Sequence, residues 1–368
     1  MPELEIWTAS WVWLDGAVHA DAGLVTDGRR VLATGRLDAL QTRYPTAPTR
    51  TKGRYLGPPL ANAHTHLDLG LGPTFTGPFP DFVRYVIGRA GRRGREAAVQ
   101  AARHASQHLL GDIAAREEVV DWWLAEAPAA GVVYWEVLGL VPPDREAEIL
   151  RATRERFERW KRLERAGGPR VGLSPHAPYS LTPSLMRRLV VLAREFDVPL
   201  QIHAAESPGE RDYFLRREGA LARFFREQGW PLDLHPTGLS PIAYLSELGV
   251  LEAGPTLIHG VQVDEADVRL LAESGSVVVS CPRSNLNLEA GLPPYDLYLH
   301  HGVPLALGTD SRASASSLDV RDEVVLLERH GQPPERTLAW AAAGGRAALG
   351  LAPPVLQPGM ELEQVEFW

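Results

Sequence analysis

From about residue 58 onward, short apolar runs alternate with longer segments whose apolar residues recur at helical spacing. Eight of the runs are expected to be strands: 59–63, 109–113, 132–138, 171–174, 200–203, 256–259, 276–280 and 304–308. The main helical segments are 96–107, 117–125, 145–166, 183–196, 211–228 and 265–274. This alternation is typical of a parallel sheet covered by helices. Eight strands favour a closed (β/α)8 barrel of the α/β class over an open doubly wound sheet.

The first 57 residues follow a different pattern. Their β-prone runs are separated by the turn signals Asp15-Gly16 and Asp27-Gly28, which indicate a small antiparallel sheet. At the other end, a helix over 337–348 precedes a tail, and 357–363 is expected to return a strand to this sheet. We therefore predict a small β-sandwich-like domain, 1–57 plus about 352–368, and a (β/α)8 barrel over 58–351.

Composition narrows the function classes. Asp and Glu outnumber Lys and Arg by 46 to 38, which disfavours a nucleic-acid groove. Cys281 is the single cysteine of the chain, so an internal disulfide, an iron–sulfur cluster and a cysteine zinc finger are excluded. No apolar run approaches the roughly 20 residues of a membrane span, and residues 1–11 lack the pattern of a secretory signal. We expect a cytoplasmic protein without a nucleic-acid or membrane partner.

The histidines gather at the ends of the expected strands. His64 and His66 follow the first, His176 follows the fourth, and His203 and His259 end the fifth and sixth; Asp310 follows the eighth. In a parallel barrel these ends meet at one mouth. Imidazoles and a carboxylate suit zinc, so the sequence predicts a metal site formed by His64, His66, His203 and Asp310. A single strand histidine is more often a hydrogen-bonded core residue, but that reading does not suit the whole set.

Glu206 lies three residues beyond His203, where its carboxyl can hang over the metal without binding it. A carboxyl in a partly dry site has a raised pKa and can move protons. The alternative is that Glu206 is a favourable charge in the first turn of the next helix. The two lysines, Lys52 and Lys161, lie outside the expected strands, so a lysine-bridged two-metal centre is disfavoured and one metal is expected.

Six motifs of the chain resemble the amidohydrolase superfamily. In chain order they are Asn62-Ala63-His64-Thr65-His66-Leu67, His176-Ala177-Pro178-Tyr179-Ser180, Gln201-Ile202-His203-Ala204-Ala205-Glu206, Leu257-Ile258-His259-Gly260, Ser280-Cys281-Pro282-Arg283-Ser284-Asn285-Leu286 and Gly308-Thr309-Asp310-Ser311. The resemblance runs from about residue 55 to 350 and is greatest to the deaminase and chlorohydrolase branch. One motif alone would be weak, whereas six in order are specific.

The resemblance implies a role for each matching residue. One divalent metal, usually zinc, with iron or manganese left open, is held by His64, His66, His203 and Asp310. Asp310 also takes a proton from the attacking water, and His259 orients that water and stabilises its charge. Glu206 gives a proton to the ring nitrogen beside the attacked carbon, and ammonia leaves. His176 resembles a histidine that meets the sugar of nucleoside substrates.

Four features depart from the pattern of relatives or leave a role open. Arg283 stands where relatives often have Thr or Ser, and Arg312 with a run of small residues follows Asp310 where relatives often have Asn. The C-terminal tail also lacks the usual ending, so the small domain is expected to consist mainly of residues 1–57. Asn285 either shapes the pocket or is a purely structural loop residue.

The segment 75–94 should cover the barrel mouth. Its aromatic residues, including Phe82, can stack on a base or aryl group, and Arg84 can bind a carboxylate. Arg283 and Arg312 would approach from the strand-seven and strand-eight sides. The ordinary alternative is that the basic cluster of Arg89, Arg92, Arg93 and Arg95 is a solvated helix start.

An acidic, aryl-extended adenine nucleoside would suit such a pocket. The chain is similar to the aminodeoxyfutalosine deaminases of menaquinone biosynthesis, which implies deamination of 6-amino-6-deoxyfutalosine. The alternatives are S-adenosylhomocysteine, methylthioadenosine or adenosine as substrate, and further off guanine deamination or dechlorination. A barrel that has lost catalysis and serves as a binding protein is a separate class. Relatives are often dimers, so a homodimer is also considered.

Overall fold

The computed structural model describes residues 3–70, 72–127, 129–140 and 142–368. Its larger part holds eight parallel strands, each within two residues of an expected one. They are β8 (Ala61–Thr65), β9 (Leu109–Ala114), β10 (Ala130–Val137), β11 (Arg170–Pro175), β12 (Gln201–Ala204), β13 (Thr256–His259), β14 (Val277–Ser280) and β15 (Leu305–Leu307). The predicted α/β architecture with a parallel sheet is therefore confirmed.

The eight strands form two four-stranded sheets, in the orders β11-β10-β9-β8 and β12-β13-β14-β15. Two isolated parallel bridges join the sheets, Leu173 with Leu200 at one edge and Thr65 with Asp310 at the other. Hydrogen bonds continue these joins, because the His203 N–H donates to the His176 carbonyl at 2.9 Å and the Thr309 N–H donates to the His64 carbonyl at 3.0 Å. The carboxyl ends of all eight strands thus meet around one mouth.

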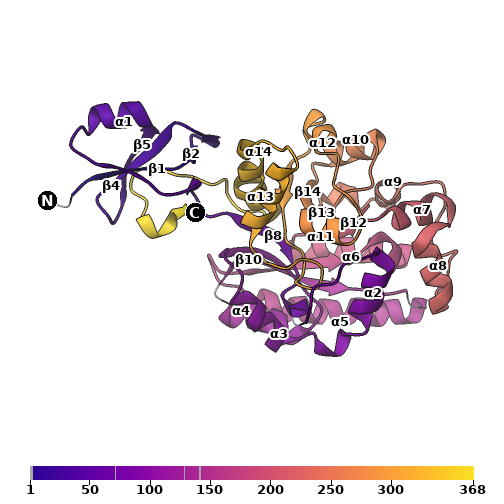
Figure 1. The fold of residues 1–368 in the computed structure, drawn as a ribbon. Coiled ribbons are helices and arrows are strands. Elements are labelled where there is room, and N and C mark those ends of the chain that lie inside the picture. The colour runs from indigo at the N-terminus through magenta and orange to yellow at the C-terminus, as the bar shows by residue number, and fades with distance from the viewer. Residues whose placement is uncertain (1–2, 71, 128, 141) are drawn as a thin grey trace.

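Helices cover the outside of the strands (Figure 1). They are α2 (Phe79–Ile87), α3 (Arg95–Ala102), α4 (Glu117–Glu126), α5 (Pro143–Lys161), α6 (Pro183–Phe196), α7 (Pro208–Arg216), α8 (Gly219–Gln228), α9 (Pro241–Glu247), α10 (Glu265–Ser274), α11 (Pro282–Asn287), α12 (Tyr295–His300), α13 (Val320–Arg329), α14 (Pro334–Ala339) and α15 (Gly345–Ala348). The expected helix 211–228 is two helices, because Arg217 (φ 59°) and Gly219 (φ 80°) adopt left-handed backbone that no α-helix continues through. That expectation was wrong.

A smaller lobe lies beside the barrel, and both chain ends belong to it (Figure 1). It contains β1 (Glu5–Thr8), β2 (Trp11–Leu14), β3 (Ala17–His19), β4 (Ala22–Thr26), β5 (Val31–Arg36), α1 (Leu37–Arg43), β6 (Thr49–Thr51), β7 (Tyr55–Gly57) and β16 (Glu366–Phe367). Its strands form two sheets, in the orders β5-β4-β1-β6 and β16-β7-β2-β3. The tail returns through β16, which pairs with β7, while 357–363 makes a single bridge between Glu361 and Arg30. The exact division into domains stays a prediction.

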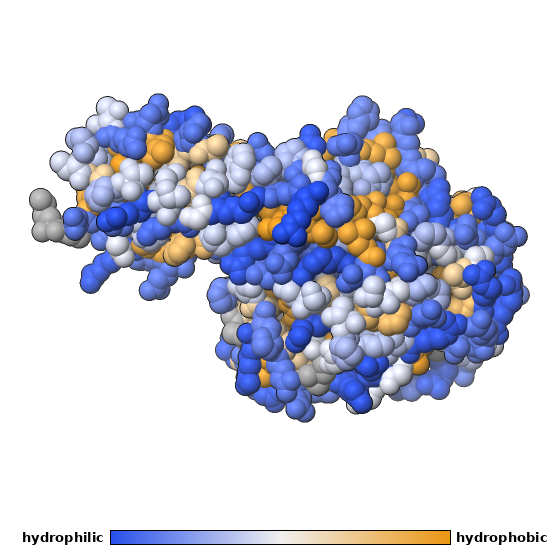
Figure 2. All heavy atoms as spheres, viewed as in Figure 1, coloured by the Kyte–Doolittle hydropathy of each residue, from blue (hydrophilic) through white to orange (hydrophobic). Residues whose placement is uncertain are grey.

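One hydrophobic cluster runs from the lobe into the barrel. It includes Trp13 and Leu24 of the lobe together with Leu60, Trp123 and Leu173 of the barrel, all of them buried. The outer face seen in Figure 2 is largely hydrophilic, with apolar areas over the middle of the molecule. Among the helices described, none combines the length and apolar character needed to cross a bilayer.

Candidate metal and proton-transfer site

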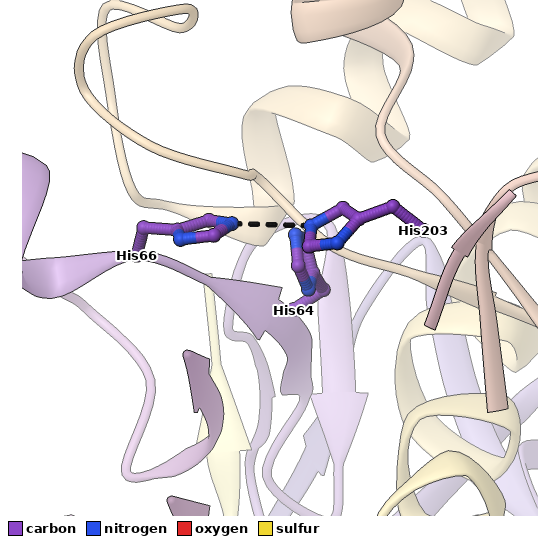
Figure 3. Close-up of side chains that lie close together, drawn as sticks. All are labelled: His64, His66 and His203. Atoms are coloured by element: carbon purple, nitrogen blue, oxygen red, sulfur yellow. Dashed lines mark hydrogen bonds between the residues drawn. The ribbon is translucent and has the colours of Figure 1, made fainter. Parts of the chain in front are cut away.

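Three buried histidines meet at the barrel mouth. His64 and His66 come from the end of β8, and His203 comes from β12 on the opposite sheet. Alternation along β8 turns both of its imidazoles to the same side, and His203 approaches them from across the barrel (Figure 3). One ring nitrogen from each histidine lies within 4.8 Å of the other two. The predicted histidines are therefore brought together.

Hydrogen bonds orient two of these rings. The His64 Nδ1 donates to Oε1 of Gln201 at 2.8 Å, while Nε2 of Gln201 donates to the carbonyl of Ala63 at 3.0 Å. The His203 Nδ1 donates to the backbone carbonyl of His176 at 2.9 Å. With the proton held on Nδ1, each ring keeps a lone pair on Nε2. Partners of this kind fix the tautomer and direction of metal-binding histidines.

The donor set fits a cation. The Nε2 atoms of His66 and His203 face each other at 3.2 Å, and the buried Nε2 of His64 has no protein partner among the described residues. Oδ1 of Asp310 lies 3.7 Å from Nε2 of His66 and 3.9 Å from Nε2 of His64. Burial lowers the pKa of His64 to about 3, so this imidazole is neutral and can bind metal at neutral pH. Three nitrogens and one carboxylate oxygen suit zinc chemistry.

Asp310 is fixed by the residues around it. Its Oδ2 accepts hydrogen bonds from the hydroxyls of Ser284 at 2.7 Å and Ser314 at 3.0 Å, and its Oδ1 accepts one from the Ser311 N–H at 2.6 Å. Its backbone is left-handed, with φ 57°. Non-glycine residues in this conformation are strained and concentrate at functional sites. The run of small residues after Asp310 therefore supplies part of its hydrogen-bonding shell.

His259 and Glu206 form the second half of the inner site. Nε2 of His259 lies 3.6 Å from Oε1 of Glu206, while its Nδ1 donates to Oδ1 of Asn285 at 2.8 Å. Burial lowers the pKa of His259 to about 4. Burial raises the pKa of Glu206 well above its ordinary value, and the charges of Asp310 and Glu210 add to the effect. A neutral imidazole thus faces a carboxyl whose pKa is raised, an arrangement suited to proton transfer.

A cavity of about 560 Å³ opens over this site. Its inner end is lined by His66, His176, His203, Glu206, His259 and Asp310. Its outer half is mainly apolar and lies between α2 and α8, with Phe79, Phe82, Val83, Val86, Ile87, Leu138, Leu140, Tyr179, Leu221, Phe224, Phe225 and Trp230 in its lining. A concave, largely apolar site with a few convergent polar groups is typical of small-molecule binding.

The segment 75–94 contributes one wall of the cavity, but its two named candidates differ. Phe82 lines the cavity. Arg84, on the same helix α2, is absent from the lining; its guanidinium binds the carboxylates of Asp81 and Glu227. The helix places the two side chains on different faces, since residues two apart on a helix do not point the same way.

The other predicted substrate contacts also differ in whether they line the cavity. His176 lines the cavity, and its Nδ1 pairs with the Ser180 hydroxyl at 2.8 Å. Arg283 and Arg312 are absent from the lining; the guanidinium of Arg283 binds the buried Glu323 at 2.7 Å. Asn285 contacts His259 rather than the cavity, so it orients a residue of the inner end.

Several residues of the site were not predicted. Gln201 orients His64, and its position before His203 gave only an indirect signal. Arg93 was taken for part of a solvated basic cluster, yet it lines the cavity and binds Asp68 at 3.0 Å and Glu136 at 3.3 Å. No local sequence pattern indicates that Arg93 is buried, because its partner Glu136 lies 43 residues further along the chain. The aromatic side chains of α8 that line the cavity, Phe224 and Phe225, were also not predicted.

The strands, the histidine cluster and the carboxyl beside it define a metal-dependent barrel hydrolase. The chain matches the amidohydrolase family over residues 55–355, which is most of its length. The protein therefore belongs to the amidohydrolase family, and its histidine cluster lies in a site for a divalent metal.

Two relatives and one solved structure illustrate the similarity. The chain is 37% identical to an aminodeoxyfutalosine deaminase of Deinococcus radiodurans, over 96% of this chain and 87% of that relative. It is 36% identical to a 5-methylthioadenosine/S-adenosylhomocysteine deaminase of Syntrophobacter fumaroxidans, over 61% of this chain and 50% of that relative. A crystal structure of Helicobacter pylori aminofutalosine deaminase superposes with a TM-score of 0.77 at 23% identity, over 97% of this chain and 90% of that chain. This last likeness concerns the fold.

Proposed function

We propose that the protein is a metal-dependent aminohydrolase of an adenine nucleoside derivative, with 6-amino-6-deoxyfutalosine as its principal substrate. The observation that carries the proposal is the near full-length similarity to an aminodeoxyfutalosine deaminase, at 37% identity. The inner site agrees with it, because a carboxyl with a raised pKa lies beside a histidine cluster. This activity would place the protein in the futalosine route to menaquinone.

His64, His66, His203 and Asp310 would hold the metal, and zinc suits their three nitrogens and one oxygen. When bound, zinc lowers the pKa of a water ligand toward about 7 and so supplies a nucleophile at neutral pH. His176 and Gln201 support this set from behind, through the carbonyl and the amide that accept from His203 and His64. Iron or manganese are alternatives that metal analysis distinguishes.

The chain's own residues would manage the protons. Glu206, with its raised pKa, would donate a proton from Oε1 or Oε2 to the ring nitrogen beside the carbon that bears the amino group. Asp310 would accept a proton from the attacking water through Oδ1, which accepts one hydrogen bond, from the Ser311 N–H, whereas Oδ2 accepts two from serine hydroxyls. His259, whose Nε2 faces the same space, would orient the water. The water oxygen would first add to the carbon; the proton held by Asp310 would then pass to the amino group, and ammonia would leave as the carbon–nitrogen bond breaks. The proton of the new hydroxyl would return to Glu206, which leaves the product carbonyl.

The outer half of the cavity would bind the rest of the nucleoside. Aromatic side chains from α2 and α8 offer faces for an aryl extension. The cation in the lining is Arg93, whose charge is already met by Asp68 and Glu136. This observation favours a second candidate, methylthioadenosine, whose extension is apolar, over S-adenosylhomocysteine, whose extension is charged.

The deciding experiment compares 6-amino-6-deoxyfutalosine, methylthioadenosine, S-adenosylhomocysteine and adenosine in one assay of the zinc-loaded protein. Ammonia release and the ultraviolet change of the purine report turnover. The proposal expects the highest kcat/KM for 6-amino-6-deoxyfutalosine. No turnover of any of the four would reject it, and absence of bound zinc, iron or manganese after gentle purification would favour a non-catalytic binding protein.

A further inference from the structure

Glu210 is a buried carboxylate for which the proposed reaction has no direct use. It lies in the first turn of α7, four residues after Glu206, and is 1% exposed. Its Oε1 accepts a hydrogen bond from the Ala205 N–H at 3.1 Å, and its Oε2 accepts one from the Glu206 N–H at 2.8 Å. Both oxygens of one carboxylate therefore hold two consecutive amides of the turn that carries Glu206.

This turn needs such support. Ala205 adopts left-handed backbone with φ 52°, a conformation that is strained for a residue with a Cβ. Its carbonyl accepts from the N–H groups of Val261 at 2.9 Å and Gln262 at 2.7 Å, directly after His259. Without Glu210, two buried N–H groups would lose their acceptors, and an unsatisfied buried donor destabilises the fold. Hydrogen bonds thus connect the turn at Ala205 to Glu210 through its N–H groups and to the segment after β13 through its carbonyl.

We propose that Glu210 is a positioning residue that fixes the carboxyl of Glu206 beside His259. The proposal rests on the proposed deamination, because it assigns Glu210 to the proton-transfer step. The 3.6 Å separation between Oε1 of Glu206 and Nε2 of His259 depends on where the backbone of residues 205 and 206 lies. A displacement near 1 Å of a reacting group can cost about 100-fold in rate.

A simpler role for Glu210 would be to start helix α7. The helix already has a cap, since the Ser207 hydroxyl accepts from the Glu210 N–H at 3.2 Å. Ser207→Ala removes this cap and leaves the carboxylate of Glu210 in place. Glu210→Gln keeps size and the N–H of residue 210, but its amide group turns a donor toward one of the two N–H groups. The two variants therefore separate helix capping from support of the turn.

The experiment measures both variants and the wild type, all zinc-loaded, on 6-amino-6-deoxyfutalosine or the best substrate of the panel. For Glu210→Gln we expect kcat to fall about 10- to 100-fold, KM to change less than about threefold, and zinc content to stay unchanged. Amide hydrogen exchange in residues 204–207 should become faster. Ser207→Ala should keep kcat within about twofold and lower only thermal stability.

Equal kcat for Glu210→Gln and the wild type, or equal losses in the two variants, would overturn the proposal. If Glu210→Gln does not fold, Glu210→Asp is measured instead; it keeps the charge but shortens the reach, and the same split is expected. If the wild type deaminates none of the nucleosides, the proposed function fails. Amide hydrogen exchange then tests the role of Glu210 without any activity. Unchanged protection of residues 205 and 206 in Glu210→Gln would reject that role.

Discussion

The inner end and the outer half of the cavity are constructed differently. At the inner end, the rings of His64, His203 and His259 each have one nitrogen fixed by a hydrogen bond that it donates to an oxygen of the protein. In the outer half, α2 and α8 present side chains such as Phe82 and Phe224, which make apolar contacts. The hydrogen bonds of the inner end fix the directions of its side chains, as a reaction at a single bond requires. The outer half has shape and apolar area, which govern affinity and substrate range.

This contrast predicts two kinds of variant. Changes at the inner end should alter metal content or kcat, because directed lone pairs and protons act in the reaction step. Changes in the outer half should alter KM and the ranking of substrates, because apolar contacts are present before and during reaction alike. Variants of one region that show the effects expected of the other would contradict this division between the inner end and the outer half.

The largest effect is expected for His203→Ala. This change removes one nitrogen of the histidine cluster, so zinc and activity should be lost together, and activity should fall to background. Metal analysis and turnover of the same preparation check this. A variant that keeps full zinc would show that His203 is outside the metal-binding set.

Glu206→Gln should separate metal binding from proton transfer. The amide cannot donate the proton that the raised pKa of Glu206 retains, so kcat should fall about 10²–10⁴-fold. Zinc content should match the wild type, since Glu206 is not among the three clustered histidines or Asp310. Near-full turnover in this variant would remove Glu206 from the proton-transfer step.

Gln201→Ala tests the support behind the metal-binding set. Without the Gln201 amide, Nδ1 of His64 loses its acceptor, and second-sphere losses of this kind reduce metal affinity about 10–100-fold. Competition with a chelator measures the affinity. Gln107→Ala is the matched control, because Gln107 is also buried but bonds Asp319 and Val320 instead. Equal zinc affinities in the two variants would contradict the role of Gln201.

Phe82→Ala tests the outer half. The loss of one aromatic face should raise KM for 6-amino-6-deoxyfutalosine about tenfold, or about 1.4 kcal/mol, with kcat little changed. The effect on adenosine, which lacks the aryl extension, should be smaller. Phe196→Ala is the control, because Phe196 packs against Phe157 and is absent from the cavity lining. A fall in kcat without a change in KM would place Phe82 in the reaction step.

The strands and the meeting of the histidines could be predicted because both follow from local patterns and one topological rule. Alternating apolar runs located β8 to β15 within two residues, and the rule that parallel strand ends converge brought His64, His66 and His203 together. The roles of individual residues at this site stay predictions, because proximity alone does not show which atom binds or transfers a proton.

The expectations that failed depend mainly on contacts between distant segments, and in one case on local backbone conformation. The break between α7 and α8 rests on two left-handed residues, Arg217 and Gly219, within a pattern that is otherwise helical. Arg283 was expected to face substrate, but its partner Glu323 lies 40 residues further along the chain. Arg93 was expected in solvent, yet Asp68 and Glu136 hold it in the cavity wall. The sequence shows that an arginine is present, but not which carboxylate it meets.

The smallest effect is expected for Arg84→Ala, which tests that distinction directly. The Arg84 side chain is 42% exposed and pairs with Asp81 and Glu227 outside the cavity lining. Exposed pairs contribute about 0–1 kcal/mol, so stability should change little. KM for an acidic substrate should stay within about twofold of the wild type. A tenfold rise in KM for 6-amino-6-deoxyfutalosine, with none for adenosine, would show that α2 turns Arg84 toward the substrate carboxylate on binding. The outer half would then select substrates by charge as well as by shape.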